Sequence, residues 1–259
     1  MNHTHTFGAD TLSSAPRRIV FVSLQKEFLD DVVRAVQSKP KCLEILHVET
    51  CTDVQDTRYE MEHGGGVAYV SPANSLGFMD SGIDFVYSRR MFPGVEREVR
   101  RRIHELDIRT TLGRAFLPIG SALLIKTADT SKSWLISAPT MFLPHDVSNT
   151  RNAYHAFLAV LTLLEKYNDR AHASEQITTL VCPALCCGYG KMLSDVAASQ
   201  MTDALHDFWV NGKRVDDTAH VSDTSVVLTR DKDTICDQQP NHYDNREIKH
   251  IDVKDIIFG

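Results

Sequence analysis

The sequence lacks the features that mark several large classes of protein. No apolar run is long enough for a membrane-spanning helix, and residues 1–16 contain no apolar core of a signal peptide. Basic residues are not in excess either, because 28 Lys and Arg stand against 34 Asp and Glu, a net charge of −6. No internal repeat or low-complexity run is visible. We therefore expect no membrane association, no general nucleic-acid binding, and a location in the cytoplasm, or in the nucleus of a eukaryote.

The cysteines and histidines form neither a disulfide framework nor a common metal motif. The six cysteines are Cys42, Cys51, Cys182, Cys186, Cys187 and Cys236. They contain no paired Cys-x-x-Cys spacing, and the twelve histidines contain no His-Glu-x-x-His. A reduced, intracellular chain is the simpler interpretation.

Length and composition fit one substantial core with extra segments at the ends. The chain has 259 residues, of which 42% are apolar and 24% charged, as is typical of a globular protein. Residues 1–16 are polar and rich in Ser and Thr, which predicts a flexible tail. We expect one domain over residues 17–230 and a C-terminal extension, residues 231–259, that docks on it.

Apolar runs and helical periodicity alternate along the chain. The runs predict strands at 18–24, 42–49, 67–70, 134–140, 177–181 and, at the sheet edge, 226–229, and a turn into a further strand within 116–125. The helical pattern predicts helices from Phe85 to a break at Pro93-Gly94, and at 26–38, 95–106, 152–167 (capped by Ser148 or Thr150) and 197–208. This alternation predicts an α/β fold with parallel strand pairs and right-handed crossovers.

Two glycine-bearing loops follow strands and lead into helices. The first, from Pro72 to Asp84, carries an amide, two carboxylates and two glycines, and the second runs from Cys182 to Met192. A strand, a glycine-bearing loop and a helix N-terminus can hold a phosphate or a ribose on backbone N–H groups. The alternative is an ordinary connection in which Asp84 caps a helix that begins at Phe85.

The order of residues in both loops resembles one known family. Ala73-Asn74-Ser75-Leu76-Gly77-Phe78-Met79-Asp80-Ser81-Gly82-Ile83-Asp84 resembles the signature of the macrodomains, in particular of MacroD-like hydrolases and of a bacterial and fungal macrodomain-like group. Pro183-Ala184, Gly188, Tyr189 and Gly190 are similar to the second ligand loop of that family, which wraps a diphosphate. Cys186-Cys187 depart from the family, which usually has small hydroxyl residues or glycine there.

The resemblance covers roughly residues 40–210 and implies a three-layer α/β/α macrodomain-like fold with a central mixed sheet. It implies that the chain binds ADP-ribose or ADP-ribosylated protein, and we expect a monomer that needs no cofactor. Zinc-dependent macrodomains carry Cys and His ligands in an expanded first loop; this loop has neither, so we expect no metal. The implied ligand-binding residues are Asp53, Val54, Asn74, Ser75, Gly77, Ser81, Gly82, Ile83, Thr140, Cys186, Cys187, Gly188, Tyr189 and Gly190.

Asp53 lies in Thr52-Asp53-Val54, which resembles the Gly-Asp-Ile segment of the family. The resemblance implies that its carboxylate accepts a hydrogen bond from the adenine amine. The alternative is an Asp that only forms a turn after the strand.

Three residues are candidates for chemistry at the distal ribose. Asn74 would fix the ribose hydroxyls through its amide, and Asp84 matches the carboxylate that orients the attacking water in MacroD-like members. Asp80 has no counterpart there, but its place in the loop makes it a second candidate base. The alternative for Asp80 is a solvated loop carboxylate.

Other chemically active residues have two interpretations each. Cys186 and Cys187 are either nucleophiles or buried small apolar residues, and no His lies in an obvious partner motif. Tyr189 is either a lid that stacks on the distal ribose or a surface aromatic. The arginines at 89–90, 97 and 100–102 predict a solvated helix face.

The sequence favours a hydrolase of an ADP-ribose derivative: mono-ADP-ribosylated protein, O-acetyl-ADP-ribose or ADP-ribose 1''-phosphate. One alternative is a non-catalytic ADP-ribose reader. Another is a scaffold in which the two loop cysteines have closed the pocket.

Overall fold

The strands form one sheet in which most neighbours run parallel. The computed structural model describes residues 15–16, 18–43, 46–55, 57, 66–127, 132–212 and 226–227. Its strands are β1 (Arg18–Val22), β2 (His47–Cys51), β3 (Gly66–Ser71), β4 (Ala122–Lys126), β5 (Ser133–Ser137), β6 (Ile177–Pro183) and the two-residue β7 (Val226–Val227). They lie in the order β2-β1-β6-β3-β5-β4-β7.

The pairing confirms an α/β fold with a mostly parallel, mixed sheet. β1, β2, β3, β5 and β6 run parallel to one another. β4 is antiparallel to β5, and β7 pairs antiparallel with β4 at the edge of the sheet, where the sequence predicted a strand. The carboxyl ends of five strands therefore meet at the same edge.

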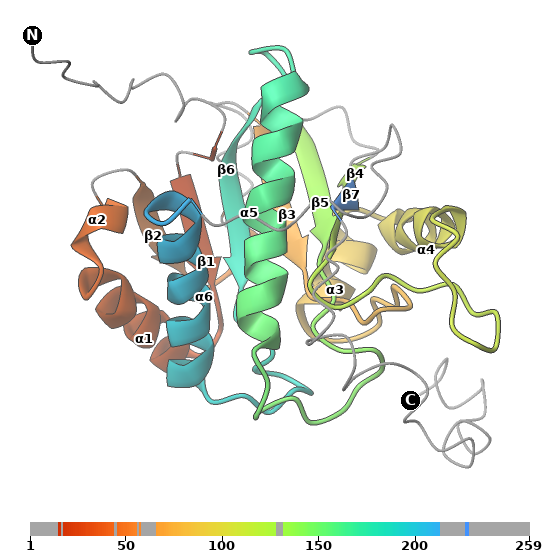
Figure 1. Cartoon of the computed structure of the whole chain (residues 1–259), viewed down its shortest axis with the longest axis horizontal. Helices are drawn as coiled ribbons and strands as arrows, with labels where there is room; N and C mark the ends of the chain where they lie inside the picture. The colour runs from red at the N-terminus through yellow and green to blue at the C-terminus, as the bar shows by residue number, and fades with distance from the viewer. Residues whose placement is uncertain are drawn as a thin grey trace, which may run out of the picture.

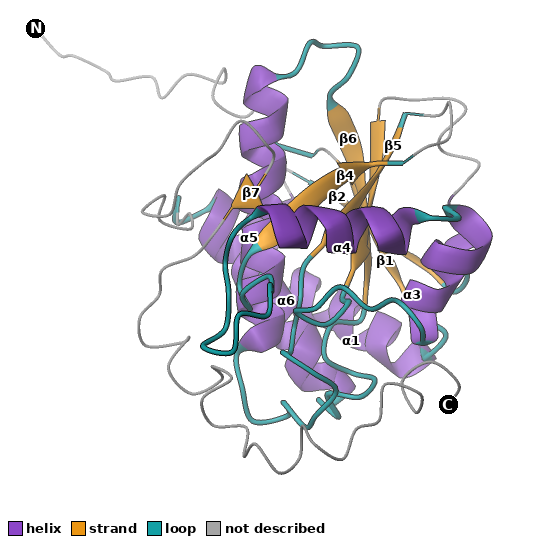
Figure 2. Ribbon diagram, turned by 90° about the vertical axis from the view of Figure 1, so that its right-hand side faces the viewer, coloured by secondary structure: helices purple, strands orange, loops and turns teal. Residues whose placement is uncertain are grey.

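Helices cover both faces of the sheet. Among the described residues they are α1 (Lys26–Gln37), α2 (Pro40–Leu43), α3 (Gly82–Val86), the π-helical turn η3 (Tyr87–Met91), α4 (Val95–Glu105), α5 (Asn152–Arg170) and α6 (Ser194–Trp209). α1, α5 and α6 pack together on one face, whereas η3 and α4 lie on the other (Figure 2). No helix in this part of the chain is long and apolar enough to cross a membrane.

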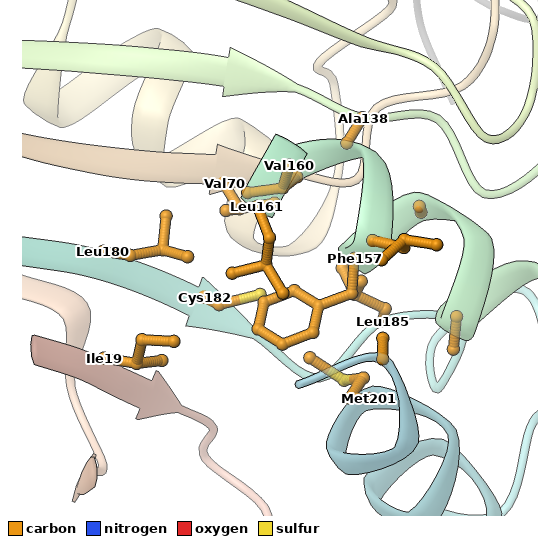
Figure 3. Packing of buried hydrophobic residues seen from close by; sticks show 14 of the residues in the cluster. Ile19, Val70, Ala138, Phe157, Val160, Leu161, Leu180, Cys182, Leu185 and Met201 are labelled. Atoms are coloured by element: carbon orange, nitrogen blue, oxygen red, sulfur yellow. The ribbon is translucent and has the colours of Figure 1, made fainter. Parts of the chain in front are cut away.

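Alternate residues of each strand supply two separate cores, because neighbouring side chains of a strand point to opposite faces. Ile19 of β1 lies in the core beneath α1, α5 and α6, where the Phe157 ring is fully buried (Figure 3). Val20 faces the other core, in which the rings of Tyr69 and Tyr87 lie 5.9 Å apart. Full burial of a side chain such as Phe157 stabilises a fold by about 1.5–3 kcal/mol, so the buried side chains on both faces of the sheet contribute to stability.

The strand predicted over 42–49 is wrong in its first half. Residues Pro40–Leu43 form α2, and β2 begins only at His47 and ends at Cys51. Pro40 suits the first position of a helix, because proline has a fixed φ and the N–H at that position needs no helical acceptor. The apolar Cys42 is buried from this short helix rather than from a strand.

Two other strands end earlier than predicted. The strands expected at 18–24 and 134–140 end at Val22 and Ser137, so their last residues belong to loops at the edge of the sheet. The predicted C-terminal extension, 231–259, lies outside the described residues, as does nearly all of the predicted tail.

One helix start and one helix cap also differ from the prediction, whereas α5 begins at Asn152 as predicted. α3 begins at Gly82 and Ser81 occupies its N-cap position, so Asp84 lies in the first turn and is not the cap. The N-cap residue of α5 is Arg151, although the Thr150 hydroxyl accepts a hydrogen bond from the first N–H of the helix at 3.3 Å. The break predicted at Pro93-Gly94 separates η3 from α4.

Candidate functional site

A crevice is expected where the paths of the chain diverge at the carboxyl edge of the sheet, at the bottom of Figure 1. The connection after β1 leads through α1 to β2, whereas the connection after β3 leads through α3 and α4 to the opposite side. β6 lies between β1 and β3. In open α/β sheets ligands bind at such a switch point. Both glycine-bearing loops border it, since they follow the neighbouring strands β3 and β6.

Asn74 shapes the loop after β3. Its side-chain oxygen accepts hydrogen bonds from the N–H groups of Leu76 (3.0 Å) and Phe78 (3.4 Å), and its backbone carbonyl accepts one from Gly77 (2.8 Å). The amide NH2 group of Asn74 has no acceptor within the described part of the chain. This group is therefore the part of Asn74 that remains for a ligand.

Ser75 and Gly77 tie the same loop to the rest of the domain. The N–H of the buried Ser75 donates to the Met141 carbonyl at 2.9 Å, and its own carbonyl accepts a hydrogen bond from Leu117 at 2.8 Å. Gly77 has φ +76°, and a Cβ on it would lie 2.8 Å from the Ile103 side chain of α4. These two predicted ligand residues thus also set the shape of the loop.

Asp84 combines partial burial with a raised pKa. Its carboxylate accepts a 2.6 Å hydrogen bond from the Ser71 hydroxyl at the end of β3. The pKa of Asp84 is raised to about 7, chiefly by burial and also by the charges of Asp80 and Glu96, while the hydrogen bond from Ser71 lowers it. The residue keeps some exposure, so its carboxyl is enclosed but not sealed from water. Such a carboxyl can take up or release a proton near neutral pH.

The residues between this loop and α3 are more open. Asp80 and Gly82 are exposed, and a Cβ on Gly82 would meet no atom within 4 Å. Ser81 makes no capping hydrogen bond with its side chain, and the partly buried Ile83 packs against the core beneath α4. Asp80 therefore lies in solvent yet acts on Asp84 through its charge.

The loop after β6 turns at Cys186 and is closely packed at Gly190. Cys186 has a left-handed backbone (φ 66°), and its carbonyl accepts a hydrogen bond from Met192 at 3.1 Å. A Cβ on Gly190 would lie 2.5 Å from that carbonyl oxygen, so the loop admits only glycine there. The Gly190 carbonyl accepts a 3.0 Å hydrogen bond from Val147, which holds the loop against the segment after β5.

The tip of this loop presents unused backbone donors. Within the described residues, the N–H groups of residues 186–190 donate to no acceptor. A Cβ on Gly188 would meet no atom within 4 Å, and Tyr189 is 64% exposed. Consecutive N–H groups in a turn form a concavity that binds anionic oxygens.

The two loop cysteines fit buried apolar residues better than nucleophiles. Burial raises the pKa of Cys186 to about 12 and that of Cys187 to about 11, so both thiols stay protonated at neutral pH. The Thr140 side chain opposes the rise in the pKa of Cys186, and the carbonyl of this buried residue accepts a 2.7 Å hydrogen bond from Asn152. Thr140 therefore supports the loop from below.

Asp53 lies at the other end of the crevice, two residues beyond β2. Its carboxylate accepts a 2.9 Å hydrogen bond from the Gln55 N–H, which is a turn-forming contact. Val54 is buried, and its carbonyl accepts a hydrogen bond from the Thr57 hydroxyl. β1 and β6 separate β2 from β3, so at about 4.8 Å per strand the ends of β2 and β3 lie about 14 Å apart. Only an elongated ligand can reach both Asp53 and Asn74.

Leu24 is a candidate that the sequence pattern missed. The prediction placed it at the end of a buried strand, but it follows β1 and is 90% exposed. The adjacent Ser23 donates its N–H to the Cys51 carbonyl at 3.1 Å, which holds the Leu24 segment beside the end of β2. Leu24 thus offers an apolar surface near Asp53. In the sequence Leu24 simply continues an apolar run. A buried core residue would give the same pattern, so the exposure of Leu24 could not be predicted.

Among the described residues, no three His, Cys, Asp or Glu side chains are grouped as a metal site requires. No protein-family model matches the chain. Over 139 residues the chain is 29% identical to an uncharacterized protein of Aquifex aeolicus (strain VF5), and this alignment covers 54% of the chain and 72% of the relative. The name of this relative indicates no activity, so any functional conclusion depends on the two loops and the carboxylates.

Proposed function

We propose that this chain is a macrodomain-like protein of three-layer α/β/α architecture that binds ADP-ribose and hydrolyses an ADP-ribose derivative. The observation that carries the proposal is the run of N–H groups at residues 186–190, which have no acceptor in the described part of the chain. Such a run suits the oxygens of a diphosphate. The resemblance of both loops to the macrodomain signature supports the same ligand.

The ligand lies along the carboxyl edge of the sheet. Asp53 and Leu24 hold the adenine end, the loop after β6 holds the diphosphate, and Asn74 and Asp84 hold the distal ribose. The strand order supports this arrangement, because β6 lies between the strand ends that carry Leu24 and Asn74. A ligand that reaches both Asp53 and Asn74 must span about 14 Å across three strand spacings, which suits an elongated molecule such as ADP-ribose.

Asp84 acts as the general base. Its pKa of about 7 leaves a large deprotonated fraction at neutral pH, and that carboxylate orients a water and takes a proton from it. The Asn74 amide donates to a ribose hydroxyl, which presents the anomeric carbon of the distal ribose or a group attached nearby. The leaving group is then a protein side chain, acetate or phosphate.

The test is turnover of mono-ADP-ribosylated protein, O-acetyl-ADP-ribose and ADP-ribose 1''-phosphate, combined with calorimetry of ADP-ribose binding. Asp84→Asn should lower turnover by about two to four orders of magnitude and change affinity little, because general-base assistance acts in the transition state. Asp80→Asn is the matched control, and a larger loss there would move the base to Asp80.

The hydrogen bond between Ser71 and Asp84 favours a second candidate, a non-catalytic ADP-ribose reader. In this function the carboxylate serves to fix the start of α3 to the end of β3. Tight binding of ADP-ribose without release of product from any of the three substrates would support the reader. Absence of ADP-ribose binding would contradict both functions.

A further inference from the structure

A polar groove lies between η3 and α4. It has a volume of about 760 Å³ and is lined by Ser88, Arg89, Gly94, Glu96, Arg97, Arg100, Arg101, His104 and Glu105. Four arginines and two glutamates thus line it, all of them on α4 except Arg89. One wall of the groove is a π-helical turn, an irregularity that often occurs at functional sites.

The arginines of the groove differ in their partners. Arg101 pairs with Glu98 and Glu105, and Arg89 lies 3.6 Å from Glu96. Arg97 and Arg100 form no ion pair with any carboxylate of the described residues. They lie three residues apart on α4, so their guanidinium groups share one face of the helix.

Arg100 is held in place without losing its donors. Its guanidinium lies 4.3 Å from the centre of the Phe78 ring, and its side chain reaches the position of Gly77. Stacking on an aromatic face orients a guanidinium while its N–H edges remain available. Because Phe78 belongs to the loop after β3, the groove adjoins the candidate site.

Glu96 supplies a second link, since this groove residue is close enough to Asp84 for its charge to raise the pKa of that carboxyl. The groove therefore lies within electrostatic reach of Asp84. The carboxylates of a chain lying in the groove would meet Arg97 and Arg100, and its backbone N–H groups would meet Glu96 and Glu105. This mixed lining suits a peptide better than a nucleic-acid backbone, which the glutamates and the net charge of −6 repel.

We propose that the groove between η3 and α4 docks an acidic polypeptide segment of a partner protein. Identification of that segment as the carrier of the ADP-ribose group rests on the proposed function, but the docking does not. The groove then selects which modified proteins reach Asp84, through charge complementarity next to the reacting group.

The experiment measures fluorescence anisotropy of a short labelled peptide of alternating Glu and Gly on the full chain. The peptide should bind, and binding should weaken as salt is added. Arg97→Gln together with Arg100→Gln should weaken binding roughly three- to tenfold, as expected for two exposed ion pairs. Lys41→Gln on α2, at the other end of the sheet, removes a positive charge far from the groove and should have no effect.

Two outcomes would overturn the docking proposal. One is that the peptide does not bind, or that it binds the arginine variant as tightly as the wild type. The other is tighter binding of a labelled single-stranded oligonucleotide, which would make the groove a nucleic-acid site. ADP-ribose calorimetry on the same sample separates the two proposals, because peptide binding without ADP-ribose binding contradicts only the proposed function.

Discussion

The hydroxyl of Ser71 donates a 2.6 Å hydrogen bond to the carboxylate of Asp84, and so joins the end of β3 to the first turn of α3. The same carboxylate is buried enough for its pKa to rise from 3.8 to about 7. One ionisation therefore affects both the stability of the fold and the proposed chemistry, with opposite signs.

Asp84→Asn should stabilise the protein at pH 8 and leave its stability nearly unchanged at pH 4. Between pH 3.8 and about 7 the unfolded wild type releases a proton that the folded state keeps, so the free energy of unfolding falls as pH rises. The loss is at most about 4 kcal/mol for a shift of this size. Asn can still accept the hydrogen bond from Ser71. Urea unfolding at a series of pH values measures the free energy of unfolding of both proteins. If this free energy changed with pH in the same way in both, the prediction would be wrong.

The rate of the proposed hydrolysis should rise with pH through about 7 and then level off. Only the deprotonated carboxylate of Asp84 serves as the base, so kcat/KM follows its ionisation in the free protein. The measurement is kcat/KM for the best substrate from pH 5 to pH 9. Ser71→Ala removes the hydrogen bond that lowers the pKa of Asp84, so the midpoint should move to higher pH. If Ser71→Ala leaves the midpoint unchanged, the pH dependence of kcat/KM does not come from Asp84.

Gly188→Val should abolish ADP-ribose binding without changing stability. Its Cβ would meet no atom within 4 Å in the protein, so a loss of binding reports on the ligand. Gly190→Ala is the contrasting variant, because its Cβ would lie 2.5 Å from the Cys186 carbonyl oxygen and should destabilise the fold by about 1–3 kcal/mol. Thermal unfolding and calorimetry of both variants test the pair. If Gly188→Val bound ADP-ribose normally, the loop after β6 would not be the diphosphate site.

Asp53→Ala should weaken ADP-ribose by about 1.5–3 kcal/mol and hardly affect ribose 5-phosphate, since only ADP-ribose presents an adenine amine to the carboxylate. Asp53→Asn keeps an acceptor for the Gln55 N–H and controls for loss of the turn. Leu24→Ser is an independent test of the same end of the site. Leu24 is 90% exposed, so its replacement should leave stability unchanged and weaken only the adenine-containing ligand. Equal weakening of both ligands would place Asp53 outside the adenine site.

Asn74→Asp should keep the loop and lose the ligand contact. An aspartate still accepts the hydrogen bonds from Leu76 and Phe78, but it has no N–H to donate to a ribose hydroxyl. ADP-ribose affinity and turnover should both fall, whereas the unfolding temperature should change little. Asn74→Ala removes the loop contacts as well and should lower stability too. Unchanged affinity in Asn74→Asp would show that the amide does not contact the ligand.

The sequence by itself determined the alternation of strands and helices and the positions of the two glycine-bearing loops. Apolar runs marked β1, β3 and β6, because buried strands need them, and Pro72 and Gly188 marked the loops that follow. Asn74 and Asp84 were named from the resemblance of the first loop to the macrodomain signature. Local signals failed at α2, where Cys42 gives the same apolar pattern in a short helix as in a strand.

Only the tertiary structure decided how these parts combine. Strand order places β6 between β1 and β3, so the two loops are neighbours and Asp53 lies three strand spacings from Asn74. The raised pKa of Asp84 depends on its enclosure and on Glu96, and Leu24 became a candidate only when its exposure was known. Gly188 and Gly190 look alike in the sequence, yet only at Gly190 would a Cβ collide with the Cys186 carbonyl. Each of these properties arises from packing in three dimensions, which residue type and spacing do not encode locally.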